Sequence, residues 1–406
     1  MRLEQLIFKK TLFLRMLNFD NTKIAFQHKS NLDLNRAYWL FRLIGSPLFV
    51  KIGKALMLVA IKLRLPIAFI VKKTIFKQFC GGETVKDCDN TIQILGTQGI
   101  GTILDYSVEG KTKEDDFDTT TEIIIDTIEK AAAEKDIPFA VFKITGISNF
   151  SLLEKASIKS KTLDPQEALE LQKIKERILK ICTKAHDLKI PVFIDAEESW
   201  VQDIIDTWVF EMMLLFNKET TIVFNTLQMY RHDRLAFLES CKALAKENNI
   251  SYGIKLVRGA YMEKERARAL ELNYPSPIQK DKASTDQDFD LAIDFIFKNL
   301  ECFSLVAGTH NEISSMKLAD SIARYNIEKK DSRVYFAQLL GMSDHISFNL
   351  THKGYNVAKY VPFGPIKEVM PYLLRRADEN TSVSGHTGRE LGLILTEKRR
   401  RKEAKA

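Results

Sequence analysis

The chain lacks the sequence features of disulfide-stabilised, zinc-binding and membrane-spanning proteins. Its five cysteines are scattered and form no Cys-x-x-Cys pair, which argues against a disulfide framework or a zinc site and favours a reducing compartment. No uncharged run approaches the roughly 20 apolar residues that span a bilayer. The opening residues lack the apolar core of a signal peptide, and although Met1 to Arg15 is basic, Glu4 and Asp20 argue against a transit peptide. We therefore expect a cytoplasmic protein, in contact with the inner membrane at most from its surface, and favour the mitochondrial matrix less.

Recognisable nucleotide-binding loops are also missing. Gly96, Gly99 and Gly101 have the spacing GxxGxG, which is the reverse of the dinucleotide fingerprint, and there is no Walker loop. The net charge of +7 comes largely from residues 398–405 at the C-terminus, so it does not indicate nucleic acid binding. A bound dinucleotide would therefore need a site without a Rossmann signature.

Apolar runs of strand length occur eight times and alternate with segments of helical periodicity. The runs are Ile100 to Leu104, Phe139 to Ile144, Val192 to Ile194, Thr221 to Asn225, Tyr252 to Val257, Ser304 to Ala307, Arg333 to Ala337 and Asn356 to Val361. The clearest helical segments between them are Glu122 to Lys135, Glu167 to Leu188 and Asp286 to Asn299. This alternation predicts an α/β protein with a parallel sheet, and eight units fit a closed (β/α)8 TIM-type barrel. A doubly wound open sheet is the alternative.

Polar side chains lie near the end of every one of these runs or follow it. They are Asp105, Tyr106 and Glu109; Lys143 and Thr145; Asp195, Glu197 and Glu198; Gln228 and Tyr230; Lys255, Arg258 and Tyr261; Thr309, His310 and Asn311; Gln338; and Tyr360. Each one alone is more often structural than catalytic. In a barrel, however, the carboxyl ends of all strands meet at one face, which is where barrel enzymes bind substrate.

The flanking segments differ from the predicted barrel. We expect a helical N-terminal region over residues 1–90 that packs on the barrel, a catalytic barrel over 91–390 and a basic C-terminal tail over 391–406. Within the first region, Ala37 to Lys77 is apolar with regularly placed cations. Lys398 to Lys405 holds six cations and one acid, which predicts a frayed, solvated end or, alternatively, attraction to an anionic membrane surface.

Five motifs resemble those of proline dehydrogenases. They are KLVRGAY at Lys255 to Tyr261, GTHN at Gly308 to Asn311, YFAQLLGM at Tyr335 to Met342, KYVPFGP at Lys359 to Pro365 and PYLLRRADEN at Pro371 to Asn380. The likeness runs over most of Gly99 to Asn380 and is greatest to the monofunctional branch that includes the mitochondrial enzymes. The resemblance implies a distorted (β/α)8 barrel, preceded by a helical extension, that holds FAD without a covalent bond.

The resemblance also implies a reaction, which is the flavin-dependent oxidation of L-proline to Δ1-pyrroline-5-carboxylate, the first step of proline catabolism. A hydride would pass from C5 to N5 of FAD, and a quinone would accept the electrons. By the same matching, Arg375 and Arg376 bind the substrate carboxylate, since a guanidinium can donate two parallel hydrogen bonds to a carboxylate. Lys143 is the third cation there and Glu379 supports Arg375, four residues away. The pyrrolidine ring is enclosed by Tyr261, Leu340 and Tyr360.

The resemblance implies the flavin side by the same matching. Asp195, Lys255 and Tyr261 are the expected catalytic residues, with Lys255 nearest N5 in the place where many bacterial relatives carry arginine. The expected FAD-binding residues are Asp195, Ala196, Gln228, Lys255, Arg258, Gly259, Ala260, Thr309, His310 and Asn311. Glu109 is a weaker match to the partner of an arginine gate over the substrate.

Three other functions stay open on the residues alone. Lysines on barrel strands suit a Schiff-base aldolase, with Lys143 and Lys255 as candidates. Asp195, Glu197 and His310 suit a metal-dependent hydrolase, although further well-placed histidines are missing. A regulatory barrel without catalysis is the third. We expect L-proline, FAD and a quinone as partners, with peripheral membrane contact possible and with no metal and no nucleic acid.

Overall fold

The structure is a computed structural model that describes residues 17–46, 48–53, 55, 68–108, 110–158, 161–382 and 386–404. Glu109 and the basic opening residues lie outside this part of the chain, and only the backbone of Glu379 lies within it. The chain forms two compact units. Unit 1 comprises residues 1–109 and 338–406, and unit 2 comprises residues 110–337. The predicted boundaries near residues 90 and 390 stay a prediction.

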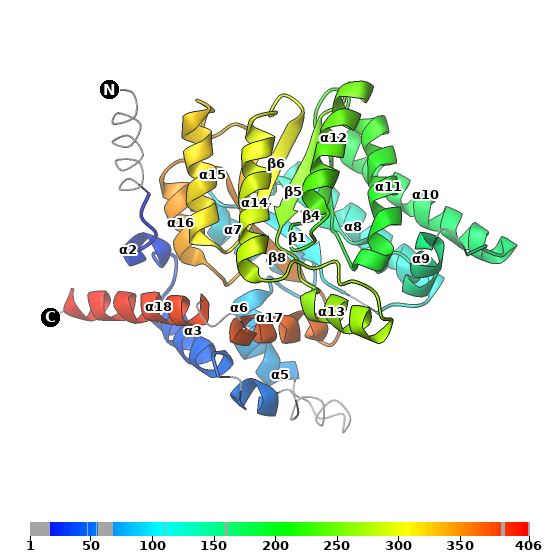
Figure 1. The fold of residues 1–406 in the computed structure, drawn as a ribbon. Helices are drawn as coiled ribbons and strands as arrows, with labels where there is room; N and C mark the ends of the chain where they lie inside the picture. The colour runs from blue at the N-terminus through cyan, green and yellow to red at the C-terminus, as the bar shows by residue number, and fades with distance from the viewer. Residues whose placement is uncertain are drawn as a thin grey trace. The chain divides into compact units, whose positions relative to one another are not determined.

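Eight parallel strands form a closed barrel in chain order (Figure 1). They are β1 (Gly101–Tyr106), β2 (Phe139–Phe142), β3 (Val192–Ile194), β4 (Val223–Gln228), β5 (Tyr252–Val257), β6 (Phe303–Gly308), β7 (Val334–Leu339) and β8 (Val357–Phe363). The predicted (β/α)8 barrel is therefore confirmed, and the open-sheet alternative is wrong. Most strand residues are buried, which explains why the strands read as continuous apolar runs.

Several strands extend further toward their carboxyl ends than the apolar runs predicted. Asp105 lies inside β1, Gln228 ends β4 and Gln338 lies inside β7. All three side chains are nearly fully buried, so a polar residue here is part of the barrel wall and does not mark the end of a strand. In the opposite sense, β2 stops at Phe142 because Ile144–Gly146 forms a 3-10 turn.

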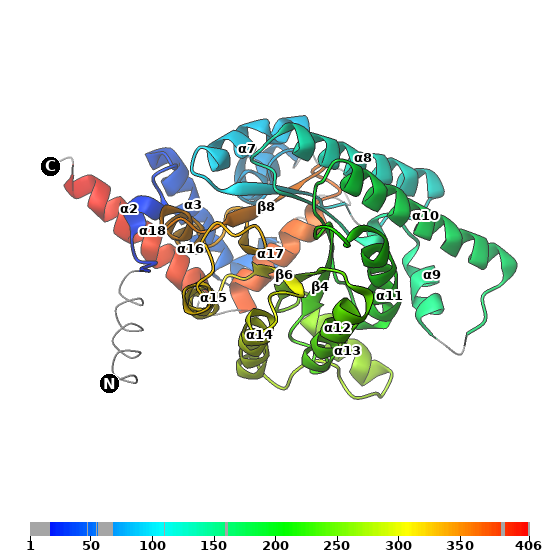
Figure 2. The ribbon, with the colours of Figure 1, turned by 90° about the horizontal axis from the view of Figure 1, so that it is seen from above.

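Unit 2 surrounds its strands with amphipathic helices. These are α8 (Glu114–Ala133), α9 (Phe150–Ser157), α10 (Pro165–Asp187), α11 (Ser199–Phe216), α12 (Arg234–Asn248), α13 (Met262–Glu271), α14 (Lys282–Phe297) and α15 (Glu312–Arg324). Local sequence sets their starts: Asp164 and Glu167 form a capping box around Pro165, and Asp281 caps α14. Figure 2 shows α8, α10 and α11 side by side.

Unit 1 contains the helices at both ends of the chain. The N-terminal ones are α2 (Thr22–Ala25), α3 (Asn31–Ile44), α5 (Ala68–Val71), the π-helix η1 (Lys72–Phe76), α6 (Lys77–Phe79), the 3-10 turn η2 (Lys86–Cys88) and α7 (Asp89–Gly96). Those after β7 are α16 (Asp344–His352), α17 (Met370–Ser382) and α18 (His386–Glu403). Phe41, Phe79, Leu373 and Ile394 belong to one buried cluster that joins the two sets.

The N-terminal region also docks directly on a barrel strand within unit 1. The Gly81 amide donates to the Pro362 carbonyl (2.8 Å), and Gly82 forms a parallel bridge with Phe363 of β8. Two non-helical residues of the N-terminal region therefore contact β8 directly.

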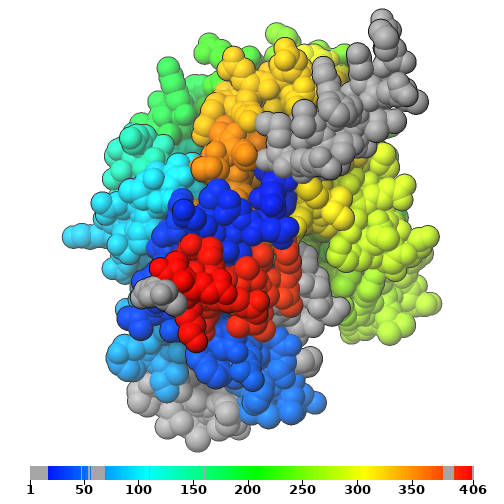
Figure 3. All heavy atoms as spheres, turned by 90° about the vertical axis from the view of Figure 1, so that its left-hand side faces the viewer, coloured from blue at the N-terminus to red at the C-terminus, as the bar shows by residue number. Residues whose placement is uncertain are grey.

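The basic C-terminal segment is helical, and the predicted frayed end is wrong. Helix α18 continues to Glu403 and lies against α2 and α3, as Figure 3 shows from one side. Glu397 is fully buried and accepts hydrogen bonds from Arg400 and Arg401. Arg401 also donates to the carbonyl of Phe26 (2.8 Å), so the charges of this helix are partly used in packing.

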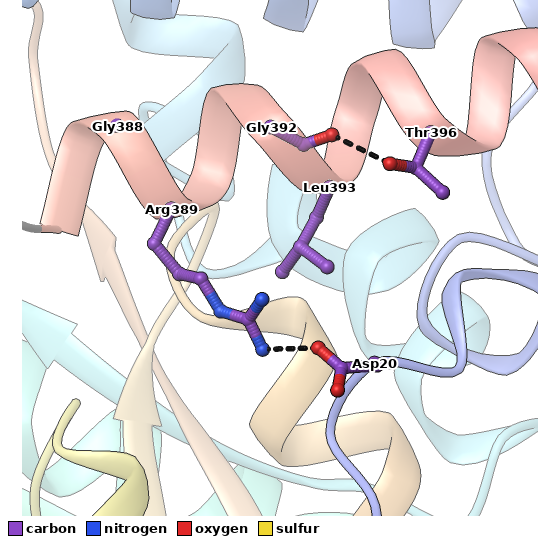
Figure 4. Close-up of a pocket in the computed structure, with 6 residues that line it drawn as sticks. All are labelled: Asp20, Gly388, Arg389, Gly392, Leu393 and Thr396. Atoms are coloured by element: carbon purple, nitrogen blue, oxygen red, sulfur yellow. Dashed lines mark hydrogen bonds and ion pairs between the residues drawn. The ribbon is translucent and has the colours of Figure 1, made fainter.

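A surface pocket of about 340 Å³ lies between α18 and the segment before α2 (Figure 4). Arg389 and Asp20 form an ion pair of 2.6 Å at its edge. None of the predicted site residues lines it, so we do not assign it to the reaction. Among the described residues, no helix is long and apolar enough to cross a bilayer, and no His, Cys, Asp or Glu cluster has the composition of a metal site.

Candidate functional site

A buried ion pair joins two of the predicted catalytic residues in unit 2. Lys255 lies in β5, where it pairs in register with Thr226 of β4 and Val306 of β6. Its ammonium binds the carboxylate of Asp195, which follows β3 directly. Lys255 is 3% exposed and its Nζ lies 5.5 Å from the centre of the Phe193 ring. The barrel strands therefore hold a buried charged pair close to an aromatic ring.

Glu197 is a buried carboxylate two residues after Asp195, which the sequence suggested only for a metal-dependent hydrolase. Its carboxylate accepts hydrogen bonds from the backbone N–H (3.0 Å) and the hydroxyl of Thr145. Its carbonyl accepts a hydrogen bond from Nε2 of Gln228 (2.6 Å). Burial raises the pKa of Glu197 to about 7, while the Thr145 hydrogen bonds and the charge of Lys143 act in the opposite direction. Glu197 thus links the ends of β2, β3 and β4.

The turn after β5 presents a fixed guanidinium. Arg258 donates to Asp286 (2.6 Å), to the Thr309 hydroxyl (2.6 Å) and to the Ser314 hydroxyl (2.9 Å). It also lies over the ring of Phe289, 4.5 Å from its centre. Three hydrogen-bond partners on different elements hold this cation in one orientation, and Asp286 among them supplies the opposite charge.

Gly259 follows Arg258 with a backbone conformation that favours glycine. Its φ is +127°, and a Cβ at this position would lie 2.6 Å from atoms of the Tyr230 ring. Any larger residue would push the turn off Tyr230. Ala260, the next residue, is exposed, so the backbone here is accessible to a ligand.

The turn after β6 is built from the GTHN motif. The Thr309 amide donates to the Ala337 carbonyl (3.0 Å), and its hydroxyl accepts from the Asn311 amide (3.1 Å). Asn311 caps α15 by accepting from the Ser314 amide, and His310 is partly buried. The N-terminus of α15 and Arg258 therefore lie in one donor-rich region of unit 2, joined through Thr309 and Ser314.

Helix α13 ties the loop after β5 to the loop after β3. Lys264 pairs with the buried Glu198, and the carboxylate of buried Glu265 accepts from the amide and hydroxyl of Ser199 (2.6 Å each). Tyr261, the predicted ring wall, immediately precedes α13 and is partly buried. The sequence predicted a charged helix here, but it did not indicate which residues these charges pair with.

The other predicted substrate residues belong to unit 1. Leu340 and Tyr360 lie next to each other, since the Leu340 amide donates to the Tyr360 carbonyl (2.8 Å). Arg375 and Arg376 lie on α17. Arg376 is 6% exposed and lies over the Tyr372 ring, 5.1 Å from its centre. Lys143 and Tyr261 belong to unit 2, so the predicted substrate residues are divided between the two units.

A closed parallel barrel with a buried ion pair and donor-rich turns at its strand ends defines a (β/α)8 barrel enzyme. The family model described as "Proline dehydrogenase" matches residues 88–389. The chain therefore belongs to the proline dehydrogenase family, a class of oxidoreductases that act on proline.

Individual proteins are also similar to this chain. "Proline dehydrogenase 1, mitochondrial" of Dictyostelium discoideum is 32% identical over 379 residues, which cover 83% of this chain and 66% of that protein. "Carbapenem antibiotics biosynthesis protein CarD" of Pectobacterium carotovorum is 32% identical over 323 residues, covering 80% and 83%. The first relative confirms the predicted likeness to the branch that includes mitochondrial enzymes.

The solved structures support the fold. Proline utilization A from Bdellovibrio bacteriovorus, in a crystal structure of the form inactivated by N-propargylglycine, superposes with a TM-score of 0.72. The two are 17% identical, and the match covers 96% of this chain and 44% of that one. The chain thus spans less than half the length of this structural neighbour and about two thirds of the Dictyostelium relative.

Proposed function

We propose that the chain is an FAD-dependent proline dehydrogenase that oxidises L-proline to Δ1-pyrroline-5-carboxylate, the first step of proline catabolism, and passes the electrons to a quinone. The observation that carries the proposal is the buried pair of Lys255 in β5 and Asp195 directly after β3. Both residues stand in positions that match the family's flavin-side motifs. A buried lysine fixed by a carboxylate provides a positive charge of defined position.

The donors in unit 2 fit a flavin dinucleotide. Arg258, the Gly259 backbone, Thr309 and the capped start of α15 suit the anionic pyrophosphate, since they offer hydrogen-bond donors and positive charge. Gln228, Asp195 and Ala196 would lie along the isoalloxazine, and His310 and Asn311 would contact the dinucleotide further along. When bound, FAD would supply the two-electron acceptor for the hydride on proline C5.

The proposed proline site uses cations from α17 and from the residue that follows β2. Arg375, Arg376 and Lys143 would bind the carboxylate, and Tyr261, Leu340 and Tyr360 would enclose the apolar ring, with Glu379 supporting Arg375. Lys255 would hold its charge beside the reacting centre, kept in place by Asp195.

The cellular setting belongs to the same proposal. A quinone acceptor is dissolved in a bilayer, so the enzyme would work at a membrane surface as a peripheral protein. The Dictyostelium relative is mitochondrial by name, whereas CarD comes from a bacterium. We retain the predicted cytoplasmic location at the inner membrane, with the mitochondrial matrix as the alternative that subcellular fractionation of the source organism would decide.

The test is the absorption spectrum of the purified protein. We expect flavin bands that L-proline bleaches under anaerobic conditions, and acid precipitation should release all the yellow colour into the supernatant. Colour that stays in the pellet would show a covalent flavin. A colourless protein that does not respond to added FAD would overturn the proposal.

A trapping experiment distinguishes the proposed dehydrogenase from a Schiff-base aldolase. Borohydride added with a carbonyl substrate would leave a covalent adduct on Lys143 or Lys255 if either lysine formed a Schiff base. The proposed dehydrogenase predicts no adduct on either lysine in the peptide mass map.

A further inference from the structure

Helix α3 is apolar on two opposite faces. Leu34, Ala37, Phe41 and Ile44 are buried in the core of unit 1. Leu32, Trp39 and Leu43 follow one another at i, i+7 and i+11 on the other side of the helix, and they are 80%, 57% and 47% exposed. Ordinary surface helices have one apolar face and one polar face, so the second apolar face indicates a second partner.

Two neighbouring segments of unit 1 expose further large apolar side chains. Leu48, Phe49 and Ile52 in the helical residues 48–53 are 65%, 56% and 46% exposed. Phe69 and Ile70 of α5 are each 64% exposed. Figures 1 and 3 both show these two segments at the same end of unit 1. We call the eight residues Leu32, Trp39, Leu43, Leu48, Phe49, Ile52, Phe69 and Ile70 the apolar patch.

Positive charge is interspersed with the apolar patch. The described residues between 32 and 79 contain six lysines and arginines and one acid, Asp33. Arg42 lies over the Trp39 ring (5.4 Å to its centre), and Nζ of Lys73 lies over the Phe69 ring (4.1 Å). Lys72 is partly offset by its ion pair with Glu83. Two acids lie nearby, but each is paired with a lysine or arginine: Asp33 with Arg36 (2.9 Å) and Glu83 with Lys72 (2.5 Å). Aromatic and aliphatic side chains beside the remaining cations match the interface of a bilayer with anionic headgroups.

We propose that the apolar patch and its cations dock the chain onto an anionic lipid surface. This rests on the proposed function, in which the electron acceptor is a quinone dissolved in the bilayer. The side chains would enter the boundary between headgroups and acyl chains while Arg42, Lys51 and Lys73 contact headgroup phosphates. The surface is distinct from the C-terminal cations of α18, which the sequence had suggested for this role.

The α18 cations are less suited because packing within unit 1 already uses several of them. Arg400 and Arg401 bind buried Glu397, and Arg401 also donates to backbone oxygens of Phe26 and Lys29. A headgroup would have to compete with these intramolecular partners.

The experiment measures sedimentation of the holoenzyme with vesicles of phosphatidylcholine and phosphatidylglycerol. Two variants test the two parts of the surface: Trp39→Ser/Phe49→Ser/Phe69→Ser removes apolar groups, and Lys51→Glu/Lys73→Glu reverses charge. All five side chains are exposed or largely exposed, so the fold should tolerate the changes. We expect each variant to bind at least about tenfold more weakly than the wild type at low salt. Raised salt should weaken wild-type binding as well.

Matched controls change the same residue types elsewhere. Leu169→Ser/Leu215→Ser and Lys218→Glu/Lys330→Glu alter exposed residues of unit 2, and we expect wild-type binding from both. Turnover with a dissolved dye acceptor should be unchanged in all variants. Absent dye turnover in the wild type would count against the proposed function and not against the surface.

Three outcomes would overturn the proposed surface. The first is a wild-type chain that does not bind these vesicles at low salt. The second is a pair of patch variants that bind as well as the wild type. The third is a wild-type dimer, seen by light scattering, that becomes a monomer in the Trp39→Ser/Phe49→Ser/Phe69→Ser variant, since the patch would then join two copies of the chain.

Discussion

Each of the two compact units holds a buried lysine on a barrel strand that pairs with an aspartate. In unit 2, Lys255 of β5 pairs with Asp195; in unit 1, Lys359 of β8 pairs with Asp344 (2.8 Å). The two lysines are 3% and 1% exposed, so burial does not distinguish them. Their aspartates do differ, because the side chain of Asp195 is 15% exposed and that of Asp344 only 6%.

The surroundings of Lys359 indicate a structural role. Its ammonium donates to the carbonyls of Leu339 (3.3 Å) and Met342 (2.8 Å) as well as to Asp344, which matches its three donors. Asp344 also binds Lys29 from the N-terminal region (2.8 Å). Burial alone would raise the pKa of Asp344, but Lys29, Lys359 and His28 together hold it well below its usual range. A buried strand lysine inside a family motif can therefore stabilise the fold. Its hydrogen-bond and charge partners distinguish a structural lysine from a catalytic one.

The largest expected effect is a loss of stability from Lys359→Met. The change leaves Asp344 buried with only part of its compensating charge. Breaking a buried pair from one side costs about 3–5 kcal/mol, and the remaining Lys29 should hold the loss near the lower end. Urea denaturation of the variant and the wild type measures the difference. An unchanged unfolding free energy would show that the cluster does not stabilise unit 1.

The matched variant Lys255→Met should lose activity more than stability. Removing a fixed charge at a reacting centre typically costs about a hundredfold in kcat. The partly exposed Asp195 can be hydrated, so the stability loss should be smaller than for Lys359→Met. Steady-state kinetics with a dye acceptor, combined with urea denaturation, separates the two roles. The exposed Lys218→Met is the control. If both buried-lysine variants lost stability equally and Lys255→Met kept its kcat, the contrast between the two pairs would be wrong.

Arg375→Met and Arg376→Met test whether any cations of unit 1 take part in the reaction, since the Lys359 cluster of that unit is structural. We expect each to raise the KM for proline at least about tenfold, since a lost charge-assisted bond to a carboxylate costs on the order of 2–4 kcal/mol. FAD content, read from the absorption spectrum, should stay near that of the wild type. Wild-type KM values in both variants would remove these arginines from the substrate site.

The barrel could be predicted because parallel strands that are buried on both faces read as apolar runs. All eight runs overlap strands of the structure. The strand ends were less predictable, because Asp105, Gln228 and Gln338 are polar residues inside the barrel wall. The helical state of residues 398–403 was missed since a cluster of like charges usually predicts a disordered end. The buried Glu397 that neutralises part of it looks like any other glutamate in the sequence.

The candidate site was predictable as a set of residues but not as a set of partners. The resemblance named Asp195, Lys255 and Arg258, whereas the pairs of Arg258 with Asp286 and of Lys264 with Glu198 join loops that are far apart in the chain. Arg258 and Asp286 are 28 residues apart, and Lys264 and Glu198 are 66 apart. A single sequence carries no signal for such pairs. Nor does it indicate that Lys359, inside a motif, is paired with Lys29 through Asp344.

A variant of Glu197 tests a buried carboxylate that, unlike Asp344, has a raised pKa. Because the folded-state pKa is about 7 and the usual value 4.5, the folded state binds more protons between these values, and wild-type stability should fall as pH rises from about 4.5 to 7. Glu197→Gln removes this titration. The variant should gain up to about 3 kcal/mol relative to the wild type between pH 5 and pH 8, at 1.36 kcal/mol per pKa unit. Urea denaturation at both pH values measures it. A constant difference at both would show that Glu197 titrates normally.

The smallest expected effect concerns the α18 cations. Like Lys359, they belong to unit 1 and pair with a buried carboxylate. Deleting residues 398–406 removes Arg400 and Arg401 and leaves the carboxylate of fully buried Glu397 without two of its donors. An unsatisfied buried polar group costs about 1–3 kcal/mol, so the unfolding free energy should fall by that amount. Deletion of residues 403–406 alone keeps both arginines and is the control. Vesicle binding should persist in both truncated chains, because the apolar patch remains. If the longer deletion left stability unchanged but abolished vesicle binding, the α18 cations would be a membrane contact and not part of the fold.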